Sequence, residues 1–344
     1  MNKLVNGEWR VDAHESTDDS GAFTRQTTTF RNWVAGSEVP SHVDAEPDDR
    51  FQPEPGRYHL YVSYACPWAH RALLARSMLD LEDVIDVSVV DPWRGDDGWQ
   101  FTPEKAGCTR DRVHDSDYLR ELYVRADPEA TCRVTVPVLY DTVEDTIVNN
   151  ESREILRMLD TAFGDLGNGR RLLPEDEAAV DRVDEIITEI YEPINNGVYR
   201  AGFATSQEAY DEAIDDLFGA LDRWDEVLAD RRFLAGDRFT EADVCMFTTL
   251  IRFDHVYHTH FMCNVRAIHE YEHLWGYLRD LYQLPGVAET VELDHITEHY
   301  YTTHPDVNPS GVVARGPDLD FEASHDRDRL GEDPFASASS IEAE

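Results

Sequence analysis

The sequence predicts a two-domain fold, in which an α/β domain is followed by an all-α helical bundle. Up to residue 163, short apolar runs rich in β-branched and aromatic residues alternate with helical segments. After a linker rich in glycine and charge at 164–174, apolar residues recur at three- and four-residue spacing, as in packed helices. A chain of 344 residues has room for about two domains.

A cysteine stands between the first buried strand and the first helix of the α/β domain. Residues 58–64 read YHLYVSY and predict the strand, and Pro67 suits the first position of a helix that runs to Met78. Cys66 therefore faces unpaired backbone N–H groups and the positive end of the helix dipole. Both favour the thiolate, so we expect its pKa to fall below the usual value of about 8.5. The alternative is a buried structural cysteine.

The later elements complete a thioredoxin-like order over 51–163. A second strand is predicted at 83–92, and a strand–helix–strand of this length implies a parallel pair. A polar insertion at 93–131 precedes a third strand at 134–141, and a short fourth strand leads to a helix that opens near Asn150 or Glu151. Because their connection is short, the third and fourth strands should be antiparallel.

The rest of the chain is assigned from its patterning. Residues 1–50 predict an extended arm that wraps the surface and inserts aromatic side chains. Residues 175–316 predict a bundle of about five to seven helices, one of which starts at Thr240 with Asp243 three residues on, resembling a capping box. The acidic segment 317–344 is expected to be disordered.

Net charge limits the possible partners. The formal charge is -39, spread along the chain, and Lys3 and Lys105 are the only lysines. This pattern is typical of adaptation to high intracellular salt and argues against nucleic-acid binding. The sequence shows no apolar leader and no apolar run near the ~20 residues of a membrane helix, so we expect a cytoplasmic protein. An odd set of cysteines without framework spacing predicts reduced thiols: Cys66, Cys108, Cys132, Cys245 and Cys263.

The predicted chemistry is that of a single thiol. Ala69 stands where a dithiol oxidoreductase carries its second cysteine, so a small thiol from solution is the favoured partner. The Val136-Pro137 step, if cis, would leave backbone groups free to pair with an extended peptide. Glu151 and Ser152, at a helix start, could hold a carboxylate or could simply cap the helix.

Other patterns allow a second interpretation. His295, Glu298 and His299 fit H-x-x-E-H, the inverted zincin pattern, but no third ligand helix accompanies them, and no metal is predicted. Packing is likewise favoured over a metal for the cluster Asp254, His255, His258 and His260. Tyr199, Tyr257 and Tyr300 could donate protons or stabilise an anion, although spacing alone favours core positions.

Taken together, the motifs resemble one family. YACPWAHR, VVDPWRGDDGWQF, RVTVPVLYD, NNESREI, INNGVYRAGF, LIRFDHVYHTHF and HITEHYY are similar to the glutathionyl-hydroquinone reductases, the Xi class of glutathione transferases, which are Omega-like. The resemblance covers roughly residues 31–309. It implies the glutathione transferase fold, with Cys66 as nucleophile and Trp99 packing on glutathione. It further implies a cysteinyl-binding segment (Arg133, Val134, Thr135, Val136 and Pro137), Glu151 and Ser152 at the γ-glutamyl end, Tyr199 as proton donor, and Tyr257 and Tyr300 bonding toward thiolate and substrate.

The implied reaction removes glutathione from a glutathionyl-hydroquinone through a mixed disulfide on Cys66, and the family is dimeric. The charge pattern raises a further hypothesis, in which γ-glutamylcysteine replaces glutathione as the thiol. Two alternatives stay open: an Omega-like thiol transferase or dehydroascorbate-type reductase, and a non-catalytic scaffold with the same fold.

Overall fold

The computed structural model describes residues 2–11, 17–331 and 333–335. The chain forms two compact units, which we describe separately. Unit 1 contains Met1–Asp18, Thr24–Gly169 and Glu289–Ala314, and unit 2 contains Asp19–Phe23, Arg170–Ala288 and Arg315–Glu344. Among the described residues, no helix has the length and apolar character needed to cross a bilayer.

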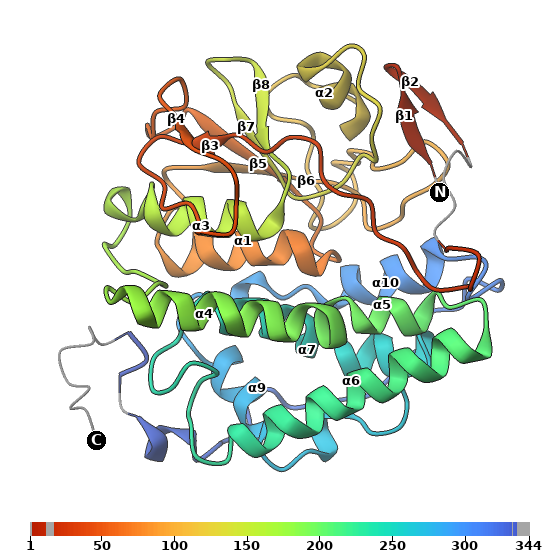
Figure 1. Ribbon diagram of the computed structural model, residues 1–344. Coiled ribbons are helices and arrows are strands. Elements are labelled where there is room, and N and C mark those ends of the chain that lie inside the picture. The colour runs from red at the N-terminus through yellow and green to blue at the C-terminus, as the bar shows by residue number, and fades with distance from the viewer. Residues whose placement is uncertain (1, 12–16, 332, 336–344) are drawn as a thin grey trace. The chain divides into compact units, whose positions relative to one another are not determined.

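A four-stranded mixed sheet forms the centre of unit 1, in the order β6-β5-β7-β8 (Figure 1). β5 (Tyr58–Val62) pairs in parallel with β6 (Asp86–Val89), while β7 (Val138–Asp141) is antiparallel to both β5 and β8 (Thr146–Asn149). All five residues of β5 are buried, as expected of a central strand covered on both faces. The two pairings predicted from the sequence, the parallel pair of β5 with β6 and the antiparallel pair of β7 with β8, are confirmed.

Helices α1 (Pro67–Met78) and α3 (Ser152–Thr161) pack side by side on one face of this sheet (Figure 1). α1 starts at Pro67, because proline lacks the N–H that a first helical residue would leave unpaired. Most residues of the helix are buried, including the run of small and apolar side chains from Ala72 to Ala75. The insertion between β6 and β7 contains α2 (Leu119–Ala126).

The N-terminal arm has more regular structure than expected. It forms the hairpin β1 (Lys3–Val5) and β2 (Glu8–Arg10), and a short parallel pair of β3 (Trp33–Val34) and β4 (Pro47–Asp48). The backbone at 30–32 runs along β8, since Asn32 N donates to Val148 O at 3.0 Å and Asn150 N donates to Phe30 O at 3.1 Å. The arm therefore covers what would otherwise be an open sheet edge.

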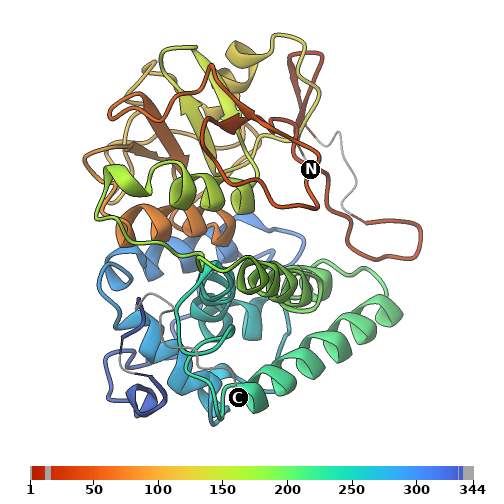
Figure 2. The same ribbon diagram turned by 60° about the vertical axis from the view of Figure 1, so that its left-hand side comes forward.

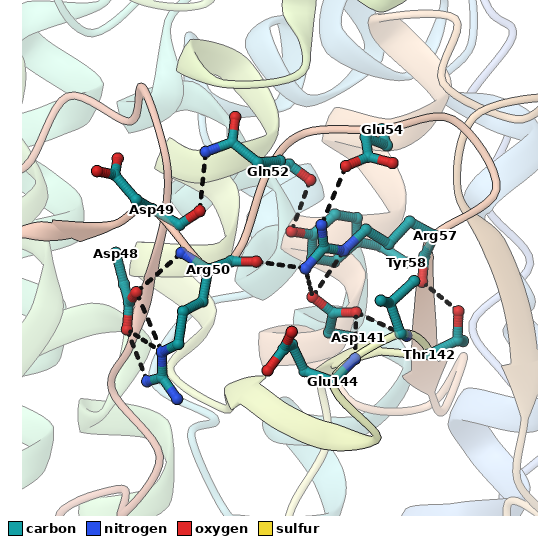
Figure 3. A network of polar contacts seen from close by, with 11 residues as sticks. Asp48, Asp49, Arg50, Gln52, Glu54, Arg57, Tyr58, Asp141, Thr142 and Glu144 are labelled. Atoms are coloured by element: carbon teal, nitrogen blue, oxygen red, sulfur yellow. Dashed lines mark hydrogen bonds and ion pairs between the residues drawn. The ribbon is translucent and has the colours of Figure 1, made fainter.

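A buried ion pair fixes the end of the arm to the sheet (Figure 3). Arg57 Nη2 lies 2.6 Å from Asp141 Oδ2, and both side chains are almost fully buried. The same guanidinium donates to the Arg50 carbonyl, and the Tyr58 hydroxyl donates to the Gln52 carbonyl at 2.9 Å. Residues 50–52 are therefore held against β5 and β7.

Unit 2 is helical, as predicted, and Figure 2 shows its helices from a second direction. Its elements are α4 (Glu177–Ile190), a π-helical turn η2 (Tyr191–Asn195), α5 (Gly197–Gly202), α6 (Gln207–Val227), α7 (Glu241–Arg252), a second π-helical turn η3 (Phe253–Tyr257), α8 (His258–His260), η4 (Ile268–Glu270), α9 (Leu274–Tyr282) and η6 (Arg327–Leu330). The predicted capping box is present, because Asp243 Oδ2 accepts from Thr240 N at 2.9 Å.

Two features differ from the sequence prediction. The helix α10 (Leu293–Thr303), expected in the helical domain at 175–316, belongs to unit 1. The segment 317–344 was expected to be disordered, but its described part packs on unit 2. Phe321 is buried against Trp275 and Tyr282, and Arg327 donates to the Leu228 and Arg232 carbonyls. An aromatic ring and a guanidinium give this acidic segment the anchors that composition alone does not reveal. Residues 332 and 336–344 of the expected tail lie outside the described residues.

Candidate active site

The thiol of Cys66 stands at the N-terminus of α1. Cys66 is the N-cap residue with extended backbone, and its carbonyl accepts from His70 N at 3.0 Å. The side chain is partly exposed, whereas Ala69 is fully buried in the next turn. The sulfur is therefore accessible at the positive end of a helix, the position at which a thiolate is stabilised.

Burial affects the other described cysteines differently. It raises the pKa of Cys108 and Cys132, and raises that of Cys263 well above its usual value. Cys245 is fully buried. A raised pKa keeps a thiol protonated at neutral pH and lowers its reactivity. Cys66 thus has the environment best suited to a nucleophile among these thiols.

The segment before β7 lies beside this thiol. The Val136-Pro137 peptide bond is cis, and Cys66 Sγ lies 3.7 Å from the Val136 carbonyl oxygen. Within the described chain, Val136 N donates no hydrogen bond. An amide beside an accessible thiol is suited to pair with the backbone of a bound peptide.

A buried hydroxyl holds the segment in place. The Tyr123 hydroxyl donates to the Thr135 carbonyl at 2.9 Å and accepts from Thr135 N at 3.2 Å. Asn150 Nδ2 donates to the same hydroxyl at 3.1 Å. This network connects α2, the segment before β7 and the start of α3, so the backbone beside Cys66 is fixed before any ligand arrives.

Arg133 carries positive charge at the other end of this segment. Burial and the positive charges of Arg94 and Arg25 lower its pKa from 12.5 to about 9. Within the described chain, the Arg133 guanidinium has no hydrogen bond and no carboxylate partner. A guanidinium surrounded by like charge is stabilised by a bound anion.

Glu151 and Ser152 sit at the start of α3. The Glu151 carboxylate accepts from Arg153 N at 3.4 Å and from Thr28 Oγ1 at 3.2 Å, so it caps the helix. The Ser152 hydroxyl is buried and accepts from Arg71 Nη1 at 3.4 Å. The capping interpretation is therefore confirmed for Glu151, while a role of either side chain in ligand binding stays a prediction.

Trp99 is buried between a cation and an imidazole. Its indole stacks on the His299 ring, with centroids 5.2 Å apart and 20° between the planes, and Arg94 lies 5.3 Å from the indole centroid. Tyr300, the residue after His299 on α10, is also buried. Trp99 and Tyr300 thus belong to the same unit as Cys66.

Tyr199 and Tyr257 lie together in unit 2. Their ring centroids are 5.9 Å apart, and Tyr199 also stacks on Phe203 and Phe23. Each is placed at a π-helical turn: η2 precedes α5, which carries Tyr199, and Tyr257 is the last residue of η3. Such turns insert an extra residue into a helix and are frequent at functional sites, because they redirect the side chains that follow.

Two family profiles match the chain. One is described as the N-terminal domain of glutathione S-transferase and matches residues 65–162, and the other as its C-terminal domain and matches 207–280. The glutathionyl-hydroquinone reductase YqjG of Escherichia coli is 46% identical over 95% of this chain and 99% of that protein. Its counterpart PcpF of Sphingobium chlorophenolicum is 44% identical over 92% of this chain and 96% of that protein.

The solved structures agree. A Xi-class transferase from Natrialba magadii is 68% identical, with a TM-score of 0.88 over 96% of this chain and 98% of that one. The glutathione-bound structure of YqjG gives a TM-score of 0.84 at 44% identity, over 95% and 99% of the two chains. The chain belongs to the Xi class of glutathione transferases.

The histidine patterns have structural roles in this Xi-class chain. His295 Nε2 and His299 Nδ1 hydrogen-bond to the backbone carbonyls of Ala106 and Pro92, at 2.7 and 2.6 Å, and Glu298 pairs with Lys105. In the second cluster, that of Asp254 and the nearby histidines, the Asp254 carboxylate binds the backbone of η4. It accepts from Ile268 N at 2.6 Å and from His269 N at 3.0 Å.

Some side chains around the Xi-class site were not found in the sequence. Tyr123 and Asn150 fix the segment before β7, and Arg94 lies over the Trp99 indole and adds positive charge near Arg133. Asn150 lies in the NNESREI motif, which could have signalled it. Tyr123 carries no such signal, because a tyrosine in an amphipathic helix is typical of ordinary packing.

Proposed function

We propose that this Xi-class protein reduces glutathionyl-hydroquinones, releasing the hydroquinone and oxidised glutathione. The observation that carries the proposal is Cys66, a partly exposed thiol at a helix N-terminus with a buried alanine in place of a second cysteine. The two bacterial relatives with this activity in their names support it over nearly the full chain.

The proposed reaction has two steps. The Cys66 thiolate attacks the glutathionyl sulfur, the bond from sulfur to the aromatic carbon breaks, and that carbon takes up a proton, so that hydroquinone leaves and a Cys66–glutathione disulfide remains. A second glutathione thiolate then attacks the glutathionyl sulfur of this disulfide. Oxidised glutathione leaves and the Cys66 thiolate returns. The hydroquinone carbon is reduced by two electrons, and these come from two sulfurs, the thioether sulfur of the conjugate and the thiol of the second glutathione, which end as the disulfide of oxidised glutathione.

The proton in the first step is assigned to a phenol. We propose Tyr199 as its donor, with Tyr257 and Tyr300 bonding toward the thiolate and the substrate oxygens. The geometry of unit 2 supports this assignment, since the Tyr199 and Tyr257 rings lie 5.9 Å apart and each is placed at a π-helical turn.

Glutathione is proposed to lie along the segment from Arg133 to Pro137. Val136 would pair with its cysteinyl backbone, and Glu151 and Ser152 would hold the γ-glutamyl end. Trp99 would pack on the peptide. Arg133 then suits the glycine carboxylate, because it has no carboxylate partner among the described residues. With γ-glutamylcysteine this last contact would be absent, and steady-state rates with each thiol distinguish the two.

The central test is mass spectrometry of the protein after incubation with a glutathionyl-hydroquinone. We expect one glutathionyl group on Cys66, release of hydroquinone, and loss of the adduct when glutathione is added. Cys66→Ser should give neither adduct nor product. Modification of another cysteine while Cys66 stays free would refute the mechanism.

An Omega-like thiol transferase is the second candidate. It is favoured by a relative from Schizosaccharomyces pombe that is named omega-like and is 44% identical over 86% of this chain. The same preparation should be assayed with dehydroascorbate and with a glutathionyl-hydroquinone. A kcat/KM for dehydroascorbate above that for the quinone conjugate would select this function.

The assembly and setting are also proposed. We infer a homodimer that works in the cytoplasm at high salt. The net charge of -39 and the likeness to a chain from Natrialba magadii support the salt adaptation. Sedimentation in concentrated KCl, where screening removes most repulsion between the acidic chains, measures the oligomeric state.

A further inference from the structure

One face of α10 is fastened along the insertion that carries Trp99. Four α10 side chains make the contacts: His295 to the Ala106 carbonyl, Glu298 to Lys105, His299 to the Pro92 carbonyl, and Thr303 to Arg94 N at 3.2 Å. We call these residues, with Lys105 and Asp91, the α10 latch. All of them belong to unit 1.

Lys105 is the ion at the centre of the latch. Its Nζ lies 2.8 Å from Asp91 Oδ1 and also pairs with Glu298, which is 193 residues away along the chain. Asp91 further accepts from Thr102 Oγ1 at 2.7 Å and from Trp93 N at 2.8 Å. The Asp91 side chain is 10% exposed, so removing Lys105 would leave a nearly buried carboxylate next to a second one.

The identity of this residue is informative. The 31 Lys and Arg side chains include only two lysines, so nearly every basic position of this chain is arginine. An ammonium is a compact point charge that fits between two carboxylates, whereas a guanidinium is a wider planar fork. Lysine at this position indicates that the geometry of the contact matters.

The latch contacts the proposed thiol site through Trp99 and Tyr300. His299, which the latch orients, is the ring on which the Trp99 indole stacks, and Tyr300 is its neighbour on the helix. Gly107, beside Lys105, approaches the His295 ring so closely that an added Cβ would lie 2.7 Å from Nε2. The insertion and α10 are therefore in close contact from His295 to Thr303.

We propose that Lys105, through its bridge from Asp91 to Glu298, is a positioning residue that sets Trp99 for thiol binding. This rests on the proposed role of Trp99 in holding glutathione. The H-x-x-E-H residues of α10 then serve to hold the helix against the insertion. Lys105, one of the two lysines of the chain, supplies the positive charge that pairs with Glu298 of this pattern.

The test compares variants in glutathione affinity and in turnover. Lys105→Met should raise the KM for glutathione and its calorimetric Kd about five- to tenfold and leave kcat within about twofold, because binding geometry is lost and the chemistry is not. Lys105→Arg, which keeps the charge, should restore at least half of the lost affinity. Lys3→Met, at the other lysine, should match the wild type.

Glu298→Gln is the milder variant, and it tests the same contact if Lys105→Met does not fold. It keeps the Lys105–Asp91 pair and should raise Kd about two- to threefold. Added to Lys105→Met it should have almost no further effect, because both changes remove the same contact. Fully additive effects, or an unchanged Kd in folded Lys105→Met, would overturn the inference.

The two proposals fail separately. Calorimetry with glutathione needs no turnover, so a wild type that binds glutathione but releases no hydroquinone would refute the reductase function and leave the latch measurable. A wild type that releases hydroquinone while Lys105→Met keeps its KM and Kd would refute the latch alone.

Discussion

At the scale of single residues, the candidate site combines an accessible thiol with an arginine that has no carboxylate partner among the described residues. Cys66 stands at a helix N-terminus, and Arg133 sits beside Arg94 and Arg25 within a strongly acidic chain. Positive charge gathered in one place, in a protein of net charge -39, focuses the field at that place and attracts anionic ligands.

Arg133 should determine how well the two candidate thiols bind. We expect Arg133→Met to raise the KM for glutathione about tenfold or more, because the glycine carboxylate loses a charged partner in a partly buried site. The KM for γ-glutamylcysteine, which has no glycine, should change much less. Both constants can be taken from initial rates of hydroquinone release.

The matched control for this variant is Arg110→Met, since Arg110 is exposed and its guanidinium has no hydrogen bond or ion pair with the described residues. An equal loss with both thiols would place Arg133 on the shared part of the ligand. No loss with either would remove it from the site.

At the scale of elements, the central strand carries a titratable group. His59 of β5 is buried, with Nε2 2.8 Å from Ser88 Oγ of β6, and burial lowers its pKa from 6.5 to about 4. In the unfolded chain it takes up a proton below about pH 6.5, whereas in the folded chain it stays neutral to about pH 4. The unfolded state therefore binds more protons in this window, and stability falls as the pH falls through it.

Because of this histidine, we expect the free energy of unfolding to fall by about 2 kcal/mol as the pH is lowered from 7 to 5. His59→Gln should flatten the pH dependence of the unfolding free energy between pH 6.5 and 4 relative to the wild type. His273→Gln, at a partly exposed histidine, should keep the wild-type slope. Denaturant titrations at constant KCl measure both, and identical slopes for wild type and His59→Gln would contradict the assignment.

The stability of the protein should also depend on a buried carboxylate at the start of α7. Asp243 accepts from Leu234 N, Thr240 N and the Tyr277 hydroxyl, all within 2.9 Å, and is fully buried. Asp243→Ala should destabilise the protein by about 2–4 kcal/mol, because these buried donors lose their acceptor. Thermal unfolding measures the loss, with Asp215→Ala on the exposed face of α6 as the control; equal melting temperatures for the two variants would contradict the role of Asp243.

The sequence predicts those elements whose causes are local. Cys66-Pro67 after a buried strand, and Thr240 with Asp243, are local signals, and both helices begin where they indicate. The π-helical turns before Tyr199 and at Tyr257 were not predicted, because one added residue barely disturbs a helical pattern. Lys105 and Glu298 are far apart along the chain, so no local signal could pair them.

The assignment of α10 shows the same limit. Its periodicity correctly predicts a helix, but periodicity does not tell which unit the helix packs on. Its contacts in the folded chain, among them those with Pro92, Ala106 and Tyr64, place it in unit 1. The roles of Tyr199, Tyr257 and Tyr300 likewise came from the family resemblance and remain predictions.

At the scale of the whole molecule, charge should make stability depend on salt. A net charge of -39 repels itself, and screening is effective only when the Debye length falls to about 3 Å near 1 M salt. We expect the melting temperature to rise steadily from 0.1 to 3 M KCl. NaCl at equal ionic strength should act similarly if screening dominates, and a melting temperature that is flat or falls with salt would contradict this explanation.

The place of α10 in unit 1 also bears on the synthesis of the chain. Unit 1 is assembled from three separate stretches, the last of which, Glu289–Ala314, follows the longest stretch of unit 2, Arg170–Ala288. A ribosome therefore releases the N-terminal sheet long before the helix that fastens its insertion. We expect the fragment 1–169 made alone to hold its sheet but to leave the loop around Trp99 without its fastening.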